Sequence, residues 1–549
     1  MNEPHLDALV VGAGFGGLYQ LYSLLKLGMK VRAIEKAQGV GGVWFWNDYP
    51  GATTDTASYL FRYSWDKEDL QSYPWPNNYL SRDEVIGYLN HIVDKHHLRQ
   101  HIRFSIEMVA ADWSEAAGKW HVQTDQGEVI TATYLFTAMG VHTRQNIPDI
   151  PGMDTFRGPL MHTASWDNNV DIVGRRVGVI GCGSSGIQIS NAIAPRIAEL
   201  HCFIRHPQFS VPLRFRPVSS AERSDINARY NNIHAAQLLS KMALDIEEAD
   251  TKTMSVTEEE RQRTFEALWR DGNSFRFIHG GFGDLTQNAE ANEEACKFLR
   301  AKIRNIVKDP AKADILTSKE LFVRRPLCDQ GWYEKFNQDN VFAIDIQKTP
   351  IIAIEENGIR TSDGQIHELD IIVLATGFQS SGGSYKTVRD GIKGRGGVSL
   401  SDHWAEEIKT FLGIFIHSFP NLFMINGPQG PFSIAPVTIE TEVEFITEMI
   451  SYLRETHRID AVVECTPEEE TKWVELCGRS ADTETLVNTV SSWLTGTNIA
   501  GAKPSTIFFY SGLKQYRSHL HEVKDAGYGV LLGRTTRRVA VNYTSFNPV

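Results

Sequence analysis

Two stretches of the chain share one order of hydrophobic and polar positions. Residues 7–12, DALVVG, form an apolar run ending in glycine, which is typical of a parallel strand buried on both faces. A glycine-rich turn, a helix and a second strand follow up to residue 36. The same order recurs in RRVGVIGCGSSGIQISNAIAPRIAELHCFIRH, residues 175–206. We therefore expect two βαβ units within an α/β fold.

The pattern changes between and after these units. Residues 214–320 are charged, helical in period and poor in strand signals, so we interpret them as a helical insertion. Strand signals return near residue 341, and NGIRTSDGQIHE resembles a hairpin with an Asp-Gly turn. A mixed region rich in loops follows residue 378.

Composition narrows the class of protein. The 549 residues suffice for two to four domains, and 42% are hydrophobic and 22% charged, as in a soluble globular protein. The net charge of −12 argues against a nucleic-acid partner, and no apolar run reaches the roughly 20 residues that span a bilayer. The N-terminus lacks a basic region before its apolar run, so we expect no signal peptide. The six cysteines form no CxxC pair, which fits free thiols in a cytoplasmic protein.

The first glycine-rich turn has the spacing Gly12-x-Gly14-x-x-Gly17 and predicts a dinucleotide site. The glycines permit a tight turn, close approach of a pyrophosphate and helix–strand packing, and the helix N-terminus favours anions. Glu35 ends the next strand, where a carboxylate accepts hydrogen bonds from an unphosphorylated ribose. This motif predicts FAD or NAD, and we assign it FAD.

The second turn, Gly181-x-Gly183-x-x-Gly186, differs in the residue that ends its second strand. Arg205 stands where the first unit has Glu35, and a guanidinium binds a 2′-phosphate that a carboxylate would repel. We therefore expect NADP here. A flavoprotein with two dinucleotides is commonly a disulfide reductase or an oxygenase, and the absence of cysteine from residues 1–180 disfavours the reductase.

These assignments divide the chain into five segments. We expect an FAD-binding domain from 1–147 and 378–549, an NADP-binding domain from 148–213 and 321–377, and the helical insertion 214–320. His97 and His101 are spaced like zinc ligands, but no HExxH glutamate accompanies them, so we predict no metal site.

Two longer motifs resemble the signatures of the Baeyer–Villiger monooxygenases, in particular the cyclohexanone monooxygenase group. FRGPLMHTASWD matches FxGxxxHxxxW followed by Pro or Asp, and GGVWFWNDYPGATTD matches the second signature, which includes Gly42, Trp44 and Asp55. The segments RRPLCDQGW, ATGF and GPQGPF are also similar to family segments. The resemblance implies a monomeric FAD enzyme that uses NADPH and O2 to convert ketones, cyclic ones among them, to esters or lactones through a flavin C4a-peroxide, and that also sulfoxidises.

The resemblance also implies roles for individual residues. Arg325 is the expected catalytic cation, and Asp55 is the carboxylate that orients it. Arg324 and Trp493 are expected at the cofactors, Phe432, Val141 and Trp493 beside the substrate. The residues expected to couple the two dinucleotide domains are Phe156, Gly158, His162, Trp166 and Asp167.

Two positions depart from the family pattern, and two other functions stay open. Arg324 replaces a lysine that many relatives carry. TAMGVHTRQN places His142 and Arg144 either at the mouth of the pocket, which they would make more polar, or in a surface loop, and we favour the surface loop. A flavin monooxygenase acting on nitrogen or sulfur is the main alternative, because it shares the shorter FxGxxxH pattern. A non-catalytic flavin scaffold is the third, and the presence of both Arg325 and Asp55 disfavours it.

Overall fold

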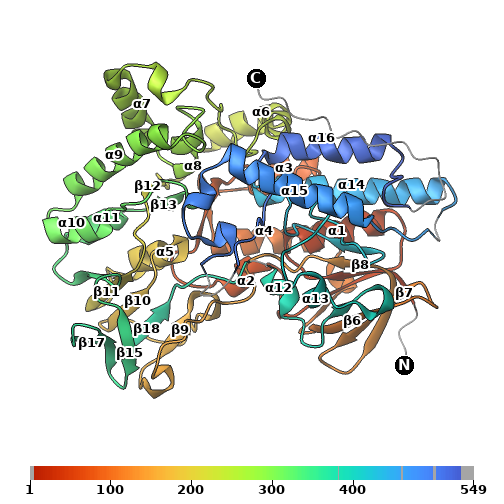
Figure 1. The fold of residues 1–549 in the computed structure, drawn as a ribbon, viewed down its shortest axis with the longest axis horizontal. Coiled ribbons are helices and arrows are strands. Elements are labelled where there is room, and N and C mark those ends of the chain that lie inside the picture. Colours follow the sequence, from red (N-terminus) through yellow and green to blue (C-terminus); the bar gives the residue numbers. More distant parts are fainter. Residues whose placement is uncertain (1–4, 381, 459–460, 499–502, 533–549) are drawn as a thin grey trace.

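The computed structural model describes residues 5–380, 382–458, 461–498 and 503–532. Two sheets lie towards opposite ends of the molecule, and helices cover them (Figure 1).

The larger, eight-stranded sheet carries the first βαβ unit at its centre. Its order is β19 (Ile392–Lys393), β6 (Met108–Ser114), β7 (Lys119–Thr124), β8 (Val129–Thr137), β1 (Leu6–Val11), β2 (Val31–Glu35) and β5 (Ile102–Phe104), and β20 (Leu422–Met424) also pairs with β8. Strand β1 is parallel to both β2 and β8, and five of its six residues are buried, as its apolar run predicts.

The second sheet is parallel throughout. Its order is β14 (Val341–Asp345), β11 (Glu199–Ile204), β10 (Arg176–Ile180), β18 (Ile371–Leu374) and β9 (Leu160–His162). Three small sheets accompany it: β12 (Ser210–Pro212) with β13 (Leu327–Asp329), β15 (Ile351–Glu355) with β16 (Gly358–Thr361) and β17 (Ile366–Glu368), and β3 (Thr53–Ala57) with β4 (Tyr79–Ser81). The antiparallel pair β16–β17 encloses the Asp-Gly turn, which confirms the predicted hairpin.

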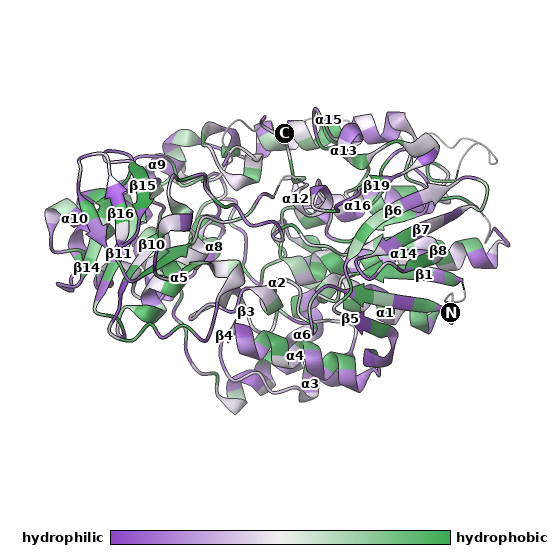
Figure 2. Ribbon diagram, turned by 90° about the horizontal axis from the view of Figure 1, so that it is seen from below, coloured by the Kyte–Doolittle hydropathy of each residue, from purple (hydrophilic) through white to green (hydrophobic). Residues whose placement is uncertain are grey.

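Helices pack against both sheets and fill the space between them. The first unit supplies α1 (Phe15–Lys26), α2 (Val43–Trp46), α3 (Lys67–Ser72) and α4 (Arg82–Lys95), and the second supplies α5 (Ser184–Ile193) and α11 (Trp332–Lys335). Between β12 and β13 lie α6 (Ser220–Leu239), α7 (Glu258–Asp271), α8 (Ser274–His279), α9 (Ala289–Ile306) and α10 (Pro310–Leu316). The later part of the chain supplies α12 (Gly383–Lys386), α13 (Leu400–His403), α14 (Ala435–Glu455), α15 (Pro467–Glu484) and α16 (Gly512–Asp525). Surface helices such as α4 alternate hydrophobic and hydrophilic bands, as amphipathic packing requires (Figure 2).

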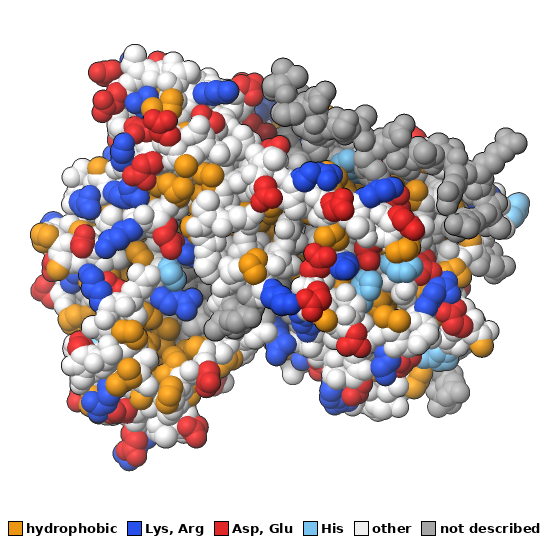
Figure 3. Space-filling model, viewed as in Figure 1, with side chains coloured by type: hydrophobic (Ala, Val, Ile, Leu, Met, Phe, Trp, Pro, Cys, Tyr) orange, Lys and Arg blue, Asp and Glu red, His pale blue; other side chains and the backbone are white. Residues whose placement is uncertain are grey.

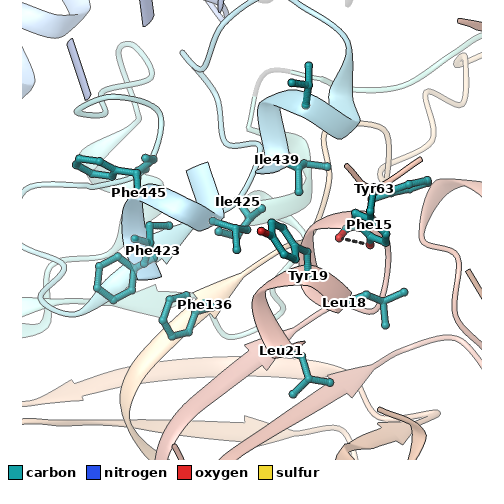
Figure 4. Close-up of a cluster of buried hydrophobic side chains, with 14 of the residues drawn as sticks. Phe15, Leu18, Tyr19, Leu21, Tyr63, Phe136, Phe423, Ile425, Ile439 and Phe445 are labelled. Atoms are coloured by element: carbon teal, nitrogen blue, oxygen red, sulfur yellow. Dashed lines mark hydrogen bonds between the residues drawn. The ribbon is translucent and has the colours of Figure 1, made fainter. Parts of the chain in front are cut away.

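The main hydrophobic core joins segments that are far apart in sequence. Residues of α1 pack against β8, β20 and α14, and Phe136 stacks on Phe423 at 4.9 Å between ring centroids (Figure 4). The hydroxyl of Tyr63 donates a hydrogen bond of 2.7 Å to the carbonyl of Phe15 at the start of α1. This core therefore fixes α1 and the glycine-rich turn before it. The α/β class predicted from the two patterns is confirmed.

Candidate active site and cofactor sites

The first glycine-rich turn has a conformation that only glycine fits well. Gly12 has φ of +108°, and a Cβ atom on Gly17 would lie 1.9 Å from the carbonyl oxygen of Gly12. Gly14 caps the N-terminus of α1, and Gly42 has φ of +57° where its backbone packs against Gly14. The turn therefore presents backbone N–H groups at the helix terminus, where a pyrophosphate is favoured.

Glu35 ends β2 beside this turn and is 6% exposed. Its carboxylate accepts hydrogen bonds from the backbone N–H groups of Ala13 (2.6 Å) and Ala37 (2.8 Å). Burial raises the pKa of Glu35, while these two hydrogen bonds oppose the rise. A carboxylate has about four acceptor positions, so two stay available for the hydroxyl groups of a ribose.

The second glycine-rich turn repeats the geometry of the first. Gly181 has φ of +112°, and a Cβ atom on Gly186 would lie 2.2 Å from the carbonyl oxygen of Gly181. Gly183 caps α5, and a Cβ atom there would meet nothing within 4 Å among the described residues. The turn therefore leaves open space at the helix N-terminus for a second dinucleotide.

Two arginines lie near the second turn, and in the described residues only one of them has an ion-pair partner. Arg205 is exposed directly after β11 and has no ion-pair partner in the described part of the chain. Arg324 instead forms an ion pair with Glu320, with Nη2 2.8 Å from the carboxylate. Both lower the pKa of the Cys182 thiol within the turn, although burial dominates and raises it to about 12. Arg205 is therefore the cation that is free to meet a 2′-phosphate.

Arg325 joins three separate parts of the chain. Its Nη2 lies 2.6 Å from the carboxylate of Asp55 on β3, and Nη1 donates to Ser184 Oγ on α5 at 3.2 Å. Its guanidinium also lies over the ring of Phe275 on α8, 5.3 Å from the centroid. Burial would lower the pKa of Arg325, but the charge and hydrogen bond of Asp55 outweigh it and raise the pKa. The arginine predicted as catalytic is therefore paired with the carboxylate predicted to orient it.

A largely apolar cavity opens against this pair, with about 580 Å³ of empty space when the open solvent at its mouth is included. Arg325 and Phe432 both line it, together with Phe275, Leu494 and Tyr510. A cation in an apolar wall can orient a polar group of a small-molecule ligand that enters the cavity. Among the residues predicted beside the substrate, Phe432 lines this cavity, whereas Val141 and Trp493 do not.

The residues that bring the two dinucleotide units together were not predicted from the sequence. Tyr49 and Ala52 follow α2 but are buried in the core of the second unit. The hydroxyl of Tyr49 donates a 2.7 Å hydrogen bond to Gln188 on α5, and the Gln188 amide donates to the carbonyl of Thr53. A Cβ atom on Gly51 would lie 2.8 Å from the carbonyl oxygen of Gln188, so the segment needs glycine there. Tyr49 lies within the GGVWFWNDYPGATTD signature, and this was the signal in the sequence that could have identified it.

The segment predicted to couple the domains lies mainly on the second unit. Phe156 packs beside β15 and β16, and a Cβ atom on Gly158 would lie 2.1 Å from the carbonyl oxygen of Asp370. His162 accepts from the N–H of Ala164 through Nδ1 and donates through Nε2 to the carbonyl of Gly377 at 3.1 Å. Burial lowers the pKa of His162 to about 4, so the ring is neutral at pH 7.

The end of this segment reaches the first unit. Trp166 packs against the second core, and Asp167 accepts from Asn169. Asn168 donates to the carboxylate of Asp48 at 2.7 Å, and the Gln145 amide donates to Ser165 Oγ, so two hydrogen bonds link this end of the segment to the first unit. The coupling roles of the five signature residues stay predictions.

In the loop at 137–146, Arg144 lies at the surface as expected but His142 does not. Arg144 is exposed as expected, but the His142 ring packs between Trp493 (4.9 Å) and Phe378 (5.4 Å). Burial, followed by the charge of Arg325, lowers the pKa of His142 to about 4. The expected surface position was therefore wrong for His142, because two aromatic rings cover it.

Trp44, on α2, packs against the first core and contacts Phe61 edge-on at 5.5 Å.

Comparison with known proteins gives matches over nearly the whole chain. The family described as flavin-binding monooxygenase-like matches residues 7–206. The chain is 41% identical to cyclohexanone 1,2-monooxygenase of Acinetobacter sp., over 96% of both chains. It is 42% identical to a phenazine N-monooxygenase of Lysobacter antibioticus, over 96% of this chain and 97% of that protein. The crystal structure of cyclohexanone monooxygenase from Rhodococcus sp. Phi1 bound to NADP+ superposes with a TM-score of 0.94 at 42% identity, covering 96% of this chain and 98% of that one.

Proposed function

The chain belongs to the flavin-dependent Baeyer–Villiger monooxygenases, and from this premise we propose that it uses NADPH and O2 to convert ketones to esters or lactones. The resemblance drawn from the two signatures is thereby confirmed, as is the fold with two Rossmann-like domains. The observation that carries the proposal is the Arg325–Asp55 ion pair, whose arginine lies in the wall of a largely apolar cavity.

The residues at the two turns fit the two cofactors. The turn at Gly12 with the buried carboxylate of Glu35 suits the pyrophosphate and ribose of FAD, and the open turn at Gly183 with Arg205 suits NADP. FAD, when bound, accepts electrons from NADPH and activates O2. We assign Gly42 and Trp44 to the FAD side, and Arg324 and Trp493 to the NADP side.

Arg325 supplies the fixed positive charge that this oxidation requires. A guanidinium has five N–H donors, and Asp55, Ser184 and the carbonyl of Pro326 accept three contacts from it. The remaining donors can bind the oxygen of a ketone as negative charge develops on it. An apolar cavity excludes water, which strengthens that interaction. Because its pKa is raised, Arg325 stays charged and gives up no proton.

Asp55 holds Arg325 in place without contacting the substrate. Its side chain binds Nη2, and its own backbone carbonyl accepts a 2.8 Å hydrogen bond from the amide of Asn273 at the start of α8. The strand β3, the insertion helix α8 and the segment at Arg325 are thus tied at one point. We propose that this junction sets the direction of the remaining N–H donors.

Oxygenation of nitrogen or sulfur is the second candidate, and the 42% identity to a phenazine N-monooxygenase favours it. A product screen with NADPH and air over ketones, sulfides and aromatic amines separates the two. Esters from ketones are the expected result. N-oxides or sulfoxides without any ester would establish the enzyme as an oxygenase of nitrogen or sulfur. NADPH oxidation that never yields an oxygenated product would support the non-catalytic flavin scaffold. Release of FAD, rather than FMN, on denaturation is expected.

We also propose a monomeric, cytoplasmic enzyme. All six cysteines are free and buried, which fits a reducing compartment. In the described ranges, no helix is long and apolar enough to cross a membrane. Acidic and basic side chains are interspersed on the face shown in Figure 3. Light scattering of the purified protein tests the monomeric state.

A further inference from the structure

The substrate cavity has a polar side that the proposed oxidation does not use. Helix α8 contributes Phe275, Ile278 and His279 to the cavity wall, and Lys241 and Glu484 lie in the wall as well. Ile278 and His279 follow Phe275 by three and four positions, so both lie next to Phe275 on the surface of the helix. The same helix therefore presents both an aromatic ring and an imidazole to the ligand.

The helix fixes how far this imidazole lies from Arg325. The guanidinium of Arg325 lies over the ring of Phe275, and His279 follows Phe275 by one helical turn. A rise of 1.5 Å per residue places the two backbone positions about 6 Å apart along the helix. A ketone whose oxygen is bound by Arg325 can therefore reach His279 with a group on the far side of a small ring.

The imidazole of His279 has hydrogen-bonding capacity to offer. Neither ring nitrogen makes a hydrogen bond to another residue in the described part of the chain. Burial, followed by the charge of Lys241, lowers the pKa of His279 to about 3, so at pH 7 it has one donor and one acceptor nitrogen. With no protein partner on either nitrogen in the described residues, the ring can hydrogen-bond to a ligand that enters the cavity.

The charges beside His279 cancel each other. Lys241 Nζ lies 3.0 Å from the carboxylate of Glu484, and Gln287 donates to the same carboxylate at 3.1 Å. This side of the cavity thus holds one positive and one negative charge that are already paired. It favours an uncharged hydroxyl or carbonyl group over a carboxylate or an ammonium group.

We propose that His279 is a specificity-determining residue that selects ketones bearing a second, uncharged oxygen group about one small ring away from the reacting carbonyl. This inference rests on the proposed function, because it takes Arg325 as the group that binds the reacting carbonyl. It assigns the substrate class as hydroxyketones and diketones in preference to hydrocarbon ketones.

The test compares 4-hydroxycyclohexanone with 4-methylcyclohexanone, in which a methyl group replaces a hydroxyl of similar size. The wild-type enzyme is expected to have the higher kcat/KM for the hydroxyketone. His279→Leu should lower the hydroxy-to-methyl ratio about tenfold, which corresponds to about 1.4 kcal/mol. The matched variant His279→Gln, which keeps a donor and an acceptor, should retain most of the ratio. FAD content and melting temperature verify that both variants are folded.

Calorimetric titration of both ketones into the NADP-loaded holoenzyme separates this inference from the proposed function. If no ester forms but hydroxyketone binding still depends on His279, the proposed function fails, while the selection of a second oxygen group by His279 is supported. If esters form and the ratio is the same in wild type and His279→Leu, the inference is overturned. A wild-type preference for 4-oxocyclohexanecarboxylate over the hydroxyketone would overturn the assignment of an uncharged group.

Discussion

Replacing Arg205 by alanine should remove most of the preference for NADPH over NADH. The two cofactors differ only in the 2′-phosphate, and Arg205 is the cation near the second turn that has no ion-pair partner in the described residues. Arg324 is the other cation nearby, but Glu320 neutralises it. The phosphate must compete with that carboxylate for Arg324, whereas it meets Arg205 freely.

The size of the effect follows from the exposure of Arg205. A hydrogen bond to a charged group contributes about 1.5–3 kcal/mol, and solvent screening at an exposed site reduces this to about 1–1.5 kcal/mol. Since 1.36 kcal/mol is a factor of ten, KM for NADPH should rise about five- to thirteenfold, and KM for NADH should change less than twofold. Arg205→Lys, which keeps the charge but loses the forked geometry, should lie between.

Glu320→Gln is the complementary change. It frees Arg324 from its ion pair, so KM for NADPH should fall severalfold. The assay is steady-state NADPH and NADH oxidation with a saturating ketone, at low and at high salt. Equal effects of Arg205→Ala on both cofactors would refute the assignment of the 2′-phosphate to Arg205.

Three further changes test the coupling and stability arguments. Tyr49→Phe removes the hydrogen bond to Gln188, so it should lower the free energy of unfolding by about 1 kcal/mol and slow anaerobic reduction of the flavin by NADPH. The control is Tyr63→Phe, which loses a hydrogen bond within the first unit. It should lower the free energy of unfolding by as much, with less effect on the rate of reduction. If the two variants slow reduction equally, the 49–53 segment has no special role in coupling. His162 has a folded pKa of about 4 against about 6.5 unfolded, so its contribution to stability is complete above pH 6.5 and is lost as the pH falls towards 4. Wild type should therefore lose about 3 kcal/mol more than His162→Gln between pH 7 and pH 4 in chemical denaturation, and parallel curves would contradict this. Asp55→Asn keeps the shape but removes the charge beside Arg325, so it should reduce ester yield less than loss of Arg325 does, as measured by gas chromatography.

The two glycine-rich turns were predicted well from the sequence, because their backbone geometry is set by residues that are close together in the chain. A strand that ends in glycine and leads into a helix leaves little choice of backbone geometry, and Gly12 and Gly181 have nearly the same φ. Glu35 lies beside the first turn for the same reason. The Arg325–Asp55 pair, in contrast, joins residues 270 positions apart and came only from the family resemblance.

The contacts between the two dinucleotide units could not be predicted from the periodicity of hydrophobic residues. The burial of Tyr49 and Ala52 in the second core depends on how two finished units pack together. The pairing of Arg324 with Glu320 and the enclosure of His142 by Phe378 and Trp493 likewise depend on tertiary packing. His279 ends a short helix whose neighbours give no sign in sequence that it lines a cavity.

The central claim is that Arg325 stabilises the negative charge that develops on the ketone oxygen. The most direct measurement is the amount of ester formed per NADPH consumed by Arg325→Ala, taken together with anaerobic stopped-flow reduction of its bound FAD. Loss of one such donor typically costs about 10²- to 10³-fold, so ester should fall by at least about 100-fold while NADPH still reduces the flavin and hydrogen peroxide accumulates. Ester formation at near wild-type yield per NADPH would contradict the account.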